Sequence, residues 1–322
     1  MIAVSVYLIV GRAREGAALS LPLTSHLLAL LAVATEIFTR ALKITWSAKA
    51  VRIELPLWVS TKITVAGDFG GSITPARSGA EPARFMVLAE SGIPASSALV
   101  VLFAELFLEM LSLAAVVVLV AVLFHDAGRV LAALVGVVGM YAAFVLGVGA
   151  IAIVLARRQV GDEPPPWAAR LHLGEKRWQR LGRGLGKVRE TVAAVRNVHP
   201  GWAIASFVAS FVHVAMRLCV LPALVLPVAP GTPLTPLALW PLGLLYGAAV
   251  VPAPGGGGAV ELAFRAALGS TIPAAVFPAA LLWWRVYTFY LYIVLGALVA
   301  GGVVLRAVRK TEDVEDEFVE ST

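Results

Sequence analysis

The stretch SALVVLFAELFLEMLSLAAVVVLVAVLF, residues 97–124, carries only two charged side chains, Glu105 and Glu109. A helix rises about 1.5 Å per residue, so about 20 apolar residues cross the roughly 30 Å hydrocarbon core of a bilayer. Residues 97–124 are therefore predicted to form a transmembrane helix.

The composition of the whole chain agrees with a membrane protein. Of the 322 residues, 59% are hydrophobic and 14% are charged, whereas about 25% are charged in a soluble domain. Too few charged side chains remain to cover a surface that faces water. The sequence thus predicts a polytopic all-α membrane bundle, with further spans at residues 18–40, 129–156, 201–226 and 273–305. Met1–Val10 is too short to span, and is either the tail of a further helix or an interfacial segment.

Two other hydrophobic stretches are interrupted by glycine, proline and charged residues. The first, residues 53–92, contains TPARSGAEPAR at 74–84. The second, residues 234–270, contains VPAPGGGGAVE at 251–261. Glycine and proline disfavour a continuous helix, so each stretch is predicted to be a broken helix.

The distribution of basic residues predicts the topology. The loop 157–199 has ten basic and four acidic residues, which favours the cytoplasm, and Arg306, Arg309 and Lys310 favour the same side for the C-terminus. The same reasoning predicts a cytoplasmic loop that contains Arg40, Lys43, Lys49 and Arg52. These assignments place both ends of each broken stretch on one side of the membrane, so each stretch must enter the membrane and return on the same side. We therefore expect two re-entrant hairpins in an inverted-repeat arrangement.

One integral membrane domain, residues 1–310, is expected. It divides into a first half at about 1–156, the cytoplasmic loop 157–199 and a second half at 200–310, followed by an acidic, disordered tail at 311–322. The expected location is the plasma membrane of a prokaryote.

Ionisable side chains at membrane depth are the candidate functional residues, because each costs about 2.5–3.5 kcal/mol to insert. Planar guanidinium groups bind phosphate bidentately, so Arg77, Arg84, Arg265 and Arg285 are candidates for binding a phosphate group. The amides of four consecutive glycines would add an anion site. The predicted substrate-binding set is Arg77, Glu81, Arg84, Glu105, Glu109, Arg217, Glu261, Arg265, Arg285 and Tyr287, with a backbone anion site at Gly255, Gly256, Gly257 and Gly258.

An alternative interpretation is that these charges form ion pairs that only hold helices together. Glu261 with Arg285 and Glu105 with Arg84 are the pairs that we expect in that case. His213 is likewise interpreted as a packed residue in preference to a proton carrier. The five histidines are scattered, so neither a metal nor another cofactor is expected. Nucleic acid is not an expected partner, because the basic residues lie in loops and at span ends without interleaved aromatic residues.

The two interrupted segments, together with Leu88-Ala89-Glu90-Ser91-Gly92, resemble the signature regions of the flippase-like membrane domain of lysylphosphatidylglycerol synthetases. The resemblance covers the chain after about residue 20. It implies that Glu81, Arg84, Glu261 and Arg285 occupy the family's motif positions. Arg285 and Tyr287 also lie where the family has an Arg-rich span start. Leu106, by contrast, stands where the family commonly has an Arg. We expect the membrane domain alone, without the aminoacyl-transferring domain.

This resemblance implies a lipid flippase-like transporter, not an enzyme, that moves an anionic or phosphate-linked lipid between leaflets through a polar groove. The expected partners are a membrane phospholipid or lipid-linked headgroup, and a second copy of the chain or a separate synthase. The alternatives are an integral-membrane enzyme that modifies a lipid headgroup, with Glu81, Glu105 or Glu109 as acid or base, and a scaffold subunit.

Overall fold

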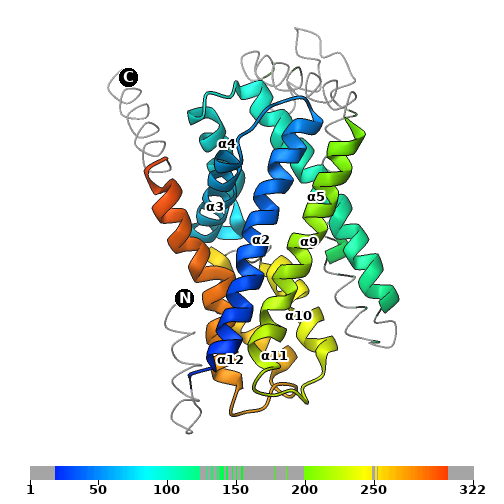
Figure 1. The fold of residues 1–322 in the computed structure, drawn as a ribbon, viewed down its shortest axis with the longest axis vertical. Helices are drawn as coiled ribbons and strands as arrows, with labels where there is room; N and C mark the ends of the chain where they lie inside the picture. Colours follow the sequence, from blue (N-terminus) through cyan, green and yellow to red (C-terminus); the bar gives the residue numbers. More distant parts are fainter. Residues whose placement is uncertain are drawn as a thin grey trace.

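The computed structural model describes residues 19–123, 199–248, 251 and 253–303, and single residues or short groups between 128 and 186. In these described parts all regular structure is helical (Figure 1). Three described helices are long and apolar enough to cross a membrane: Ser97–Leu123, Pro200–Val225 and Phe277–Val303. They confirm the helices predicted at 97–124, 201–226 and 273–305, and the chain is a multi-pass helical membrane protein.

Helix α2 (Leu23–Ala50) is longer than the predicted span at 18–40. The prediction that Arg40, Lys43 and Lys49 form a loop is wrong, because all three lie inside this helix. Arg40 and Lys43 are buried and form ion pairs with carboxylates of neighbouring helices. These carboxylates solvate the two cations in place of water, so the helix can continue past Arg40.

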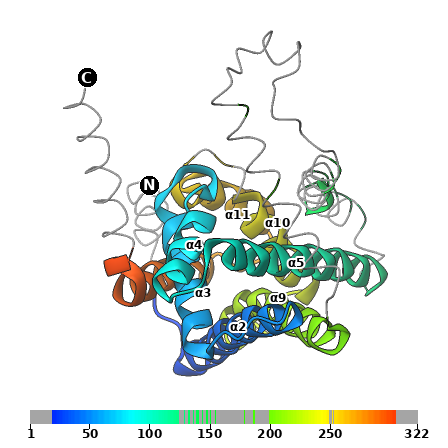
Figure 2. The same ribbon diagram turned by 90° about the horizontal axis from the view of Figure 1, so that it is seen from above.

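Helix α9 (Pro200–Val225) runs antiparallel to α2, and the two lie side by side along one edge of the bundle (Figure 2). At one end the His199 amide donates to the Ala50 carbonyl over 2.9 Å. At the other end the Ser25 hydroxyl donates to the Leu224 carbonyl over 3.1 Å. Helix α5 (Ala95–Leu123) contacts both helices.

The stretch predicted to be broken at 53–92 forms a helical hairpin. Helix α3 (Leu57–Ile73), the 3₁₀ turn η1 (Pro75–Arg77) and α4 (Ala80–Glu90) follow one another. Thr74 is extended because the proline after it disfavours helical backbone at that position. A Cβ at Gly70 would lie 2.5 Å from the Gly79 carbonyl oxygen, so glycine allows α3 and α4 to approach closely.

The second broken stretch forms a second helical hairpin, from α10 (Leu234–Gly247) through the turn η4 (Pro254–Gly256) to α11 (Ala259–Leu268). Gly255 and Gly256 have φ values of 58° and 65°, a conformation that favours glycine. Both predicted interruptions are therefore confirmed.

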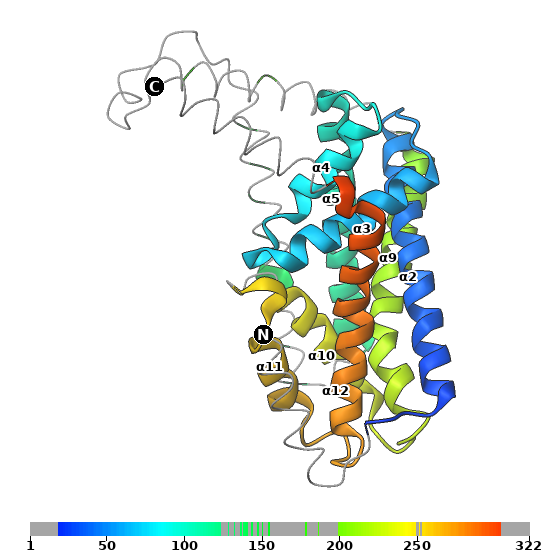
Figure 3. The same cartoon turned by 90° about the vertical axis from the view of Figure 1, so that its left-hand side faces the viewer.

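The two hairpins occupy opposite ends of the bundle and meet at their tips. Figure 3 shows α3 and α4 in the half of the bundle away from α10 and α11. The turns η1 and η4 contact each other. Helix α12 (Phe277–Arg285) continues through the π-helical turn η5 (Val286–Tyr290) past both hairpins. The hairpin tips thus place irregular backbone inside the bundle.

Several predicted segments lie outside the described residues. These are Met1–Val10 at the N-terminus, almost all of the span at 129–156 and the loop 157–199, and the tail 311–322.

Candidate functional site

Polar side chains recur at helical spacing on the faces where α2, α5 and α9 meet. On both α2 and α9 they occupy positions i, i+4, i+7 and i+11, which place them along one face of a helix. This polar seam consists of Glu36, Arg40, Lys43 and Ser47 of α2, Ser206, Ser210, His213 and Arg217 of α9, and Glu105, Glu109 and Ser112 of α5. Eleven residues of helix correspond to roughly 16 Å, or half of the hydrocarbon core.

Serines of the polar seam hold the three helices together. Ser47 and Ser206 are 2.8 Å apart at their hydroxyls, and Ser206 also donates to the Lys43 carbonyl over 3.0 Å. Ser112 and Ser210 hydrogen bond over 2.6 Å. Small hydroxylated residues allow helices to approach closely in a bilayer and satisfy each other, so the charged groups are held in a rigid frame.

The first group of charges, which we call the arginine cluster, contains Glu36, Arg40, Asp68, Arg77 and Arg217. Arg40 holds Asp68 of α3 with both terminal nitrogens, at 2.6 and 3.2 Å, and Glu36 at 3.3 Å. Such a two-pronged contact fixes the geometry of both side chains. With both carboxylates ionised, three guanidinium groups face two carboxylates, and the cluster has a formal charge of +1.

Arg77 and Arg217 form the two ends of the arginine cluster. Arg77 contacts Asp68 at 3.2 Å from the tip of the first hairpin, and has a left-handed φ of 56°. Arg217 reaches Glu36 only at 3.9 Å and lies over the Tyr292 ring. Among the described ion pairs, these two arginine side chains are the most exposed, at 30% and 20%, against 6% for Arg40. The buried Arg217 Nε has no hydrogen-bond partner within the described parts of the chain.

The second group of charges, which we call the carboxylate cluster, contains Lys43, Glu81, Arg84, Glu105 and Glu109. Lys43 lies between Glu105 at 2.5 Å and Glu109 at 2.9 Å. Arg84 contacts Glu105 at 3.0 Å and Glu81 at 3.2 Å. Two cations face three carboxylates, so with all of them ionised this cluster has a formal charge of −1.

The Glu261–Arg285 pair holds the tip of the second hairpin. Arg285 Nε lies 3.0 Å from Glu261 Oε1, and Arg285 Nη2 donates to the Gly255 carbonyl over 3.3 Å. The ion pairs Glu261–Arg285 and Glu105–Arg84 that the sequence predicted are therefore confirmed as contacts.

Three of the four glycine amides predicted as an anion site, those of Gly256, Gly257 and Gly258, are engaged within the hairpin tip. The Gly258 amide donates to the Glu261 carboxylate over 2.8 Å. Those of Gly256 and Gly257 donate to backbone carbonyls of the same turn. In this structure the chain's own carboxylate takes the place of an external anion.

Arg265 and Tyr287 lie apart from both clusters. Arg265 is exposed on α11. The Tyr287 hydroxyl hydrogen bonds with His26 Nδ1 over 2.9 Å, near the start of α2. The structure thus brings Arg77, Glu81, Arg84, Glu105, Glu109 and Arg217 into the two clusters and places the remaining predicted residues elsewhere.

The predicted set of site residues omitted Glu36, Arg40, Lys43, Asp68 and Tyr292. Tyr292 donates to Glu36 over 2.5 Å from the last membrane helix. The spacing of Glu36, Arg40, Lys43 and Ser47 is the signal that would have found the α2 face. The sequence does not predict this face, because Arg40 and Lys43 are assigned to a cytoplasmic loop.

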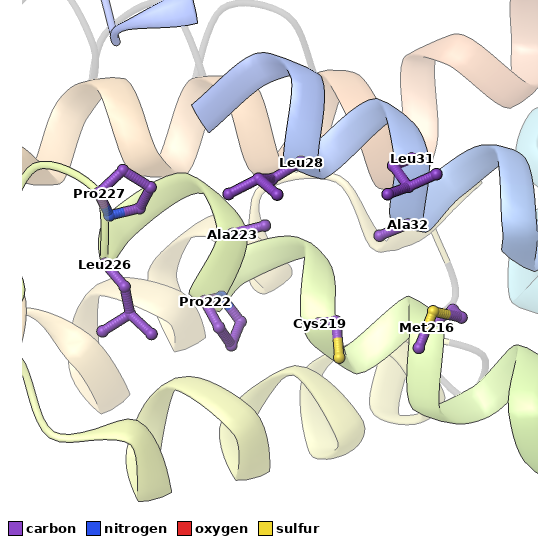
Figure 4. A pocket seen from close by; sticks show the side chains of 9 residues that line it. All are labelled: Leu28, Leu31, Ala32, Met216, Cys219, Pro222, Ala223, Leu226 and Pro227. Carbon is purple, nitrogen blue, oxygen red and sulfur yellow. The ribbon is translucent and has the colours of Figure 1, made fainter. Parts of the chain in front are cut away.

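An apolar groove of about 370 Å³ lies between α2 and α9, and none of its lining residues belongs to either cluster (Figure 4). Leu28, Leu31, Met216 and Cys219 are among its lining residues, and all of them are apolar or weakly polar. A lipid headgroup requires polar partners, so this groove is not the candidate site. Within the described residues no group of three His, Cys, Asp or Glu side chains could hold a metal ion.

Comparison with known proteins identifies the family. No curated protein matches the chain. One family model, described as lysylphosphatidylglycerol synthase TM region, matches residues 2–296. This range includes both hairpins, both charge clusters and the polar seam. Because the match extends over most of the 322 residues, the chain belongs to the lysylphosphatidylglycerol synthase TM region family.

Proposed function

We propose that this protein is a transporter that moves an anionic, phosphate-linked lipid between the two leaflets. The observation that carries the proposal is the arginine cluster beside the hairpin tips, with Arg77 and Arg217 partly exposed and its formal charge unbalanced. A buried excess of positive charge attracts an anion, and guanidinium groups match the geometry of phosphate.

In this proposal the two hairpins are re-entrant and form an inverted repeat. The local backbone supports this relationship. Thr74 and Ala253 are both extended before a proline, with ψ values of 148° and 143°. Two residues after each proline, Arg77 and Gly256 have φ values of 56° and 65°. Both tips therefore share an extended residue before a proline and a left-handed residue two positions after it, although Gly255 adds a second left-handed residue to the second tip.

The path for the lipid follows from the arrangement of polar and apolar surfaces. The headgroup would pass beside the hairpin tips and the partly exposed Arg77 and Arg217, while the acyl chains stay in the hydrocarbon. Irregular backbone at membrane depth is tolerated where it lines such a path. A second copy of the chain, or a separate synthase that supplies the lipid, remains a proposed partner.

Lipid exchange in vesicles tests this function. The protein is reconstituted with fluorescent phosphatidylglycerol, and a membrane-impermeant reductant bleaches the outer leaflet. Wild-type protein should carry the inner-leaflet lipid to the outer leaflet, where the reductant bleaches it. Arg77→Gln and Arg217→Gln should slow this exchange at least about tenfold, a loss of about 1.4 kcal/mol of transition-state stabilisation. Arg52→Gln is the matched control, because Arg52 is an exposed arginine with a left-handed φ of 62° outside both clusters. Equal rates in all four proteins would exclude the arginine cluster as the site.

We propose transport in preference to chemical modification of the headgroup. Glu105 and Glu109 share the Lys43 ammonium, so neither is a free base of the kind that headgroup chemistry requires. Incubation of the purified protein with a lipid extract should yield no new lipid species by mass spectrometry. A new species would favour the enzyme.

A further inference from the structure

The two charge clusters have opposite imbalances. The arginine cluster has three cations and two carboxylates, and the carboxylate cluster has two cations and three carboxylates. Together their formal charges cancel. An anionic headgroup bound between Arg77 and Arg217 would neutralise the first cluster and leave the second with an unmatched negative charge. Unmatched charge at membrane depth is unfavourable, so a compensating positive charge would stabilise the bound state.

His213 is the neutral group best placed to supply that charge. Its side chain is 2% exposed, and its buried Nδ1 has no hydrogen-bond partner in the described parts of the chain. His213 lies one turn beyond Ser210 on α9, and Glu109 lies one turn before Ser112 on α5. The Ser112–Ser210 hydrogen bond joins these two faces.

The charges around His213 come from both clusters. Lys43 and Glu109 of the carboxylate cluster and Arg40 and Arg217 of the arginine cluster all belong to the same polar seam as His213. Burial of the ring disfavours its charged form, and three of these four groups are cations, so the imidazole is neutral while no anion is bound. A phosphate at Arg217 would offset that cationic field, and the Glu109 carboxylate would then stabilise the imidazolium.

The remaining elements packed on α9 add few charges. Helix α10 contributes Tyr246 as its ionisable side chain, and α12 with η5 contributes Arg285, Tyr287 and Tyr290. Tyr292, which follows η5, is engaged by Glu36, and Arg285 by Glu261. These contacts leave His213 as the candidate for taking up a proton.

We propose that His213 binds one proton when an anionic lipid headgroup binds to the arginine cluster, so that lipid and proton cross the membrane together as an electroneutral pair. The inference rests on the proposed transport function and adds its coupling ion. In one cycle the proton goes from water onto the imidazole and returns to water when the lipid leaves. Binding of the two is reciprocal, so each favours the other.

Proton uptake during lipid binding tests the proposal. Purified protein in a neutral detergent and weak buffer is titrated with short-chain phosphatidylglycerol between about pH 5 and 8 while a pH indicator records proton uptake. The phosphodiester stays ionised over this range, so any uptake belongs to the protein. We expect about one proton per bound lipid for wild-type protein and for His199→Gln, the control at an exposed histidine before α9.

Two variants separate charge compensation from a structural role. His213→Gln should take up no proton, because the imidazole is gone. It should also bind the lipid about tenfold more weakly, because nothing then balances the charge of the carboxylate cluster. Glu109→Gln removes the excess negative charge and should therefore bind at least as tightly as wild-type protein, also without uptake. Melting temperatures within a few degrees of wild type show that both variants are folded.

Two results would overturn the inference. One is lipid binding by wild-type protein without proton uptake, and the other is unchanged uptake in His213→Gln. Transport itself is judged separately in vesicles. Exchange that ignores a pH gradient would remove the proton coupling and leave the transport proposal standing, whereas no exchange at all would remove the transport proposal.

Discussion

Lys43 is a lysine that is almost fully buried in a membrane helix, where an ammonium group is stable only with partners. Its side chain is 1% exposed and lies between two carboxylates of α5. An ion pair of this kind adds little net stability compared with apolar residues, but loss of one partner leaves charges that water cannot reach. Lys43 therefore connects α2 with α5.

The first prediction concerns this residue. Lys43→Met should lower the free energy of unfolding by about 3–5 kcal/mol, because Glu105 and Glu109 lose their shared cation. Thermal unfolding in detergent measures the effect. Lys49→Met is the control on the same helix, since Lys49 is exposed and its ammonium lies over the Trp202 ring, a contact worth about 0.5–1 kcal/mol. Similar losses in both variants would show that Lys43 has no special structural role.

Residue patterns in the sequence predicted part of this site. Glu105 and Glu109 are one helical turn apart, a spacing that places both on one side of a helix, and both contact Lys43. Glu81 and Arg84 are three residues apart, which places them on one face of a helix, and they form a 3.2 Å ion pair. Asp68, by contrast, pairs with Arg40, which lies 28 positions away on another helix, as well as with Arg77. A partner on another helix leaves no periodic signal in the chain.

At the scale of elements, the tight packing of each hairpin sets where its tip lies. The α3–α4 contact depends on Gly70 and Gly79, and the Thr74 hydroxyl connects the Gly70 carbonyl to the Gly79 amide with two 2.8 Å hydrogen bonds. Because Arg77 belongs to this turn, the packing of the two helices positions its guanidinium group at Asp68.

The second prediction follows from that packing. Gly70→Ala should separate α3 from α4 and displace Arg77, because the new Cβ would lie 2.5 Å from the Gly79 carbonyl oxygen and 2.8 Å from the Ala83 Cβ. We expect a loss of about 1–3 kcal/mol in stability, as for other overpacked sites. Gly247→Ala is the control, since nothing lies within 4 Å of its Cβ position in α10. Equal melting temperatures of Gly70→Ala and wild type would contradict the prediction.

At the scale of the whole molecule, the hairpins enter from opposite ends and their tips meet beside the last membrane helix (Figure 3). A re-entrant hairpin begins and ends on one face of the membrane. The ends of the two hairpins should therefore face different compartments.

The third prediction tests this topology with cysteines introduced into a Cys219→Ser background. Glu54→Cys and Glu90→Cys should react with a membrane-impermeant maleimide from one face, and Leu234→Cys and Ser270→Cys from the other, because all four positions are exposed at hairpin ends. Labelling of Glu54→Cys and Glu90→Cys from opposite faces would show that the first hairpin crosses the membrane completely.

The sequence alone determined that this chain is a helical membrane protein, where three of its long apolar helices lie and where two helices break. Those properties depend on local composition, on the length needed to cross a bilayer and on the backbone limits of glycine and proline. Only the tertiary structure decided which charges meet. Arg40 and Lys43 lie inside a helix because carboxylates from other helices surround them. Their solvation is a property of the assembled bundle, and so is the opposite charge of the two clusters.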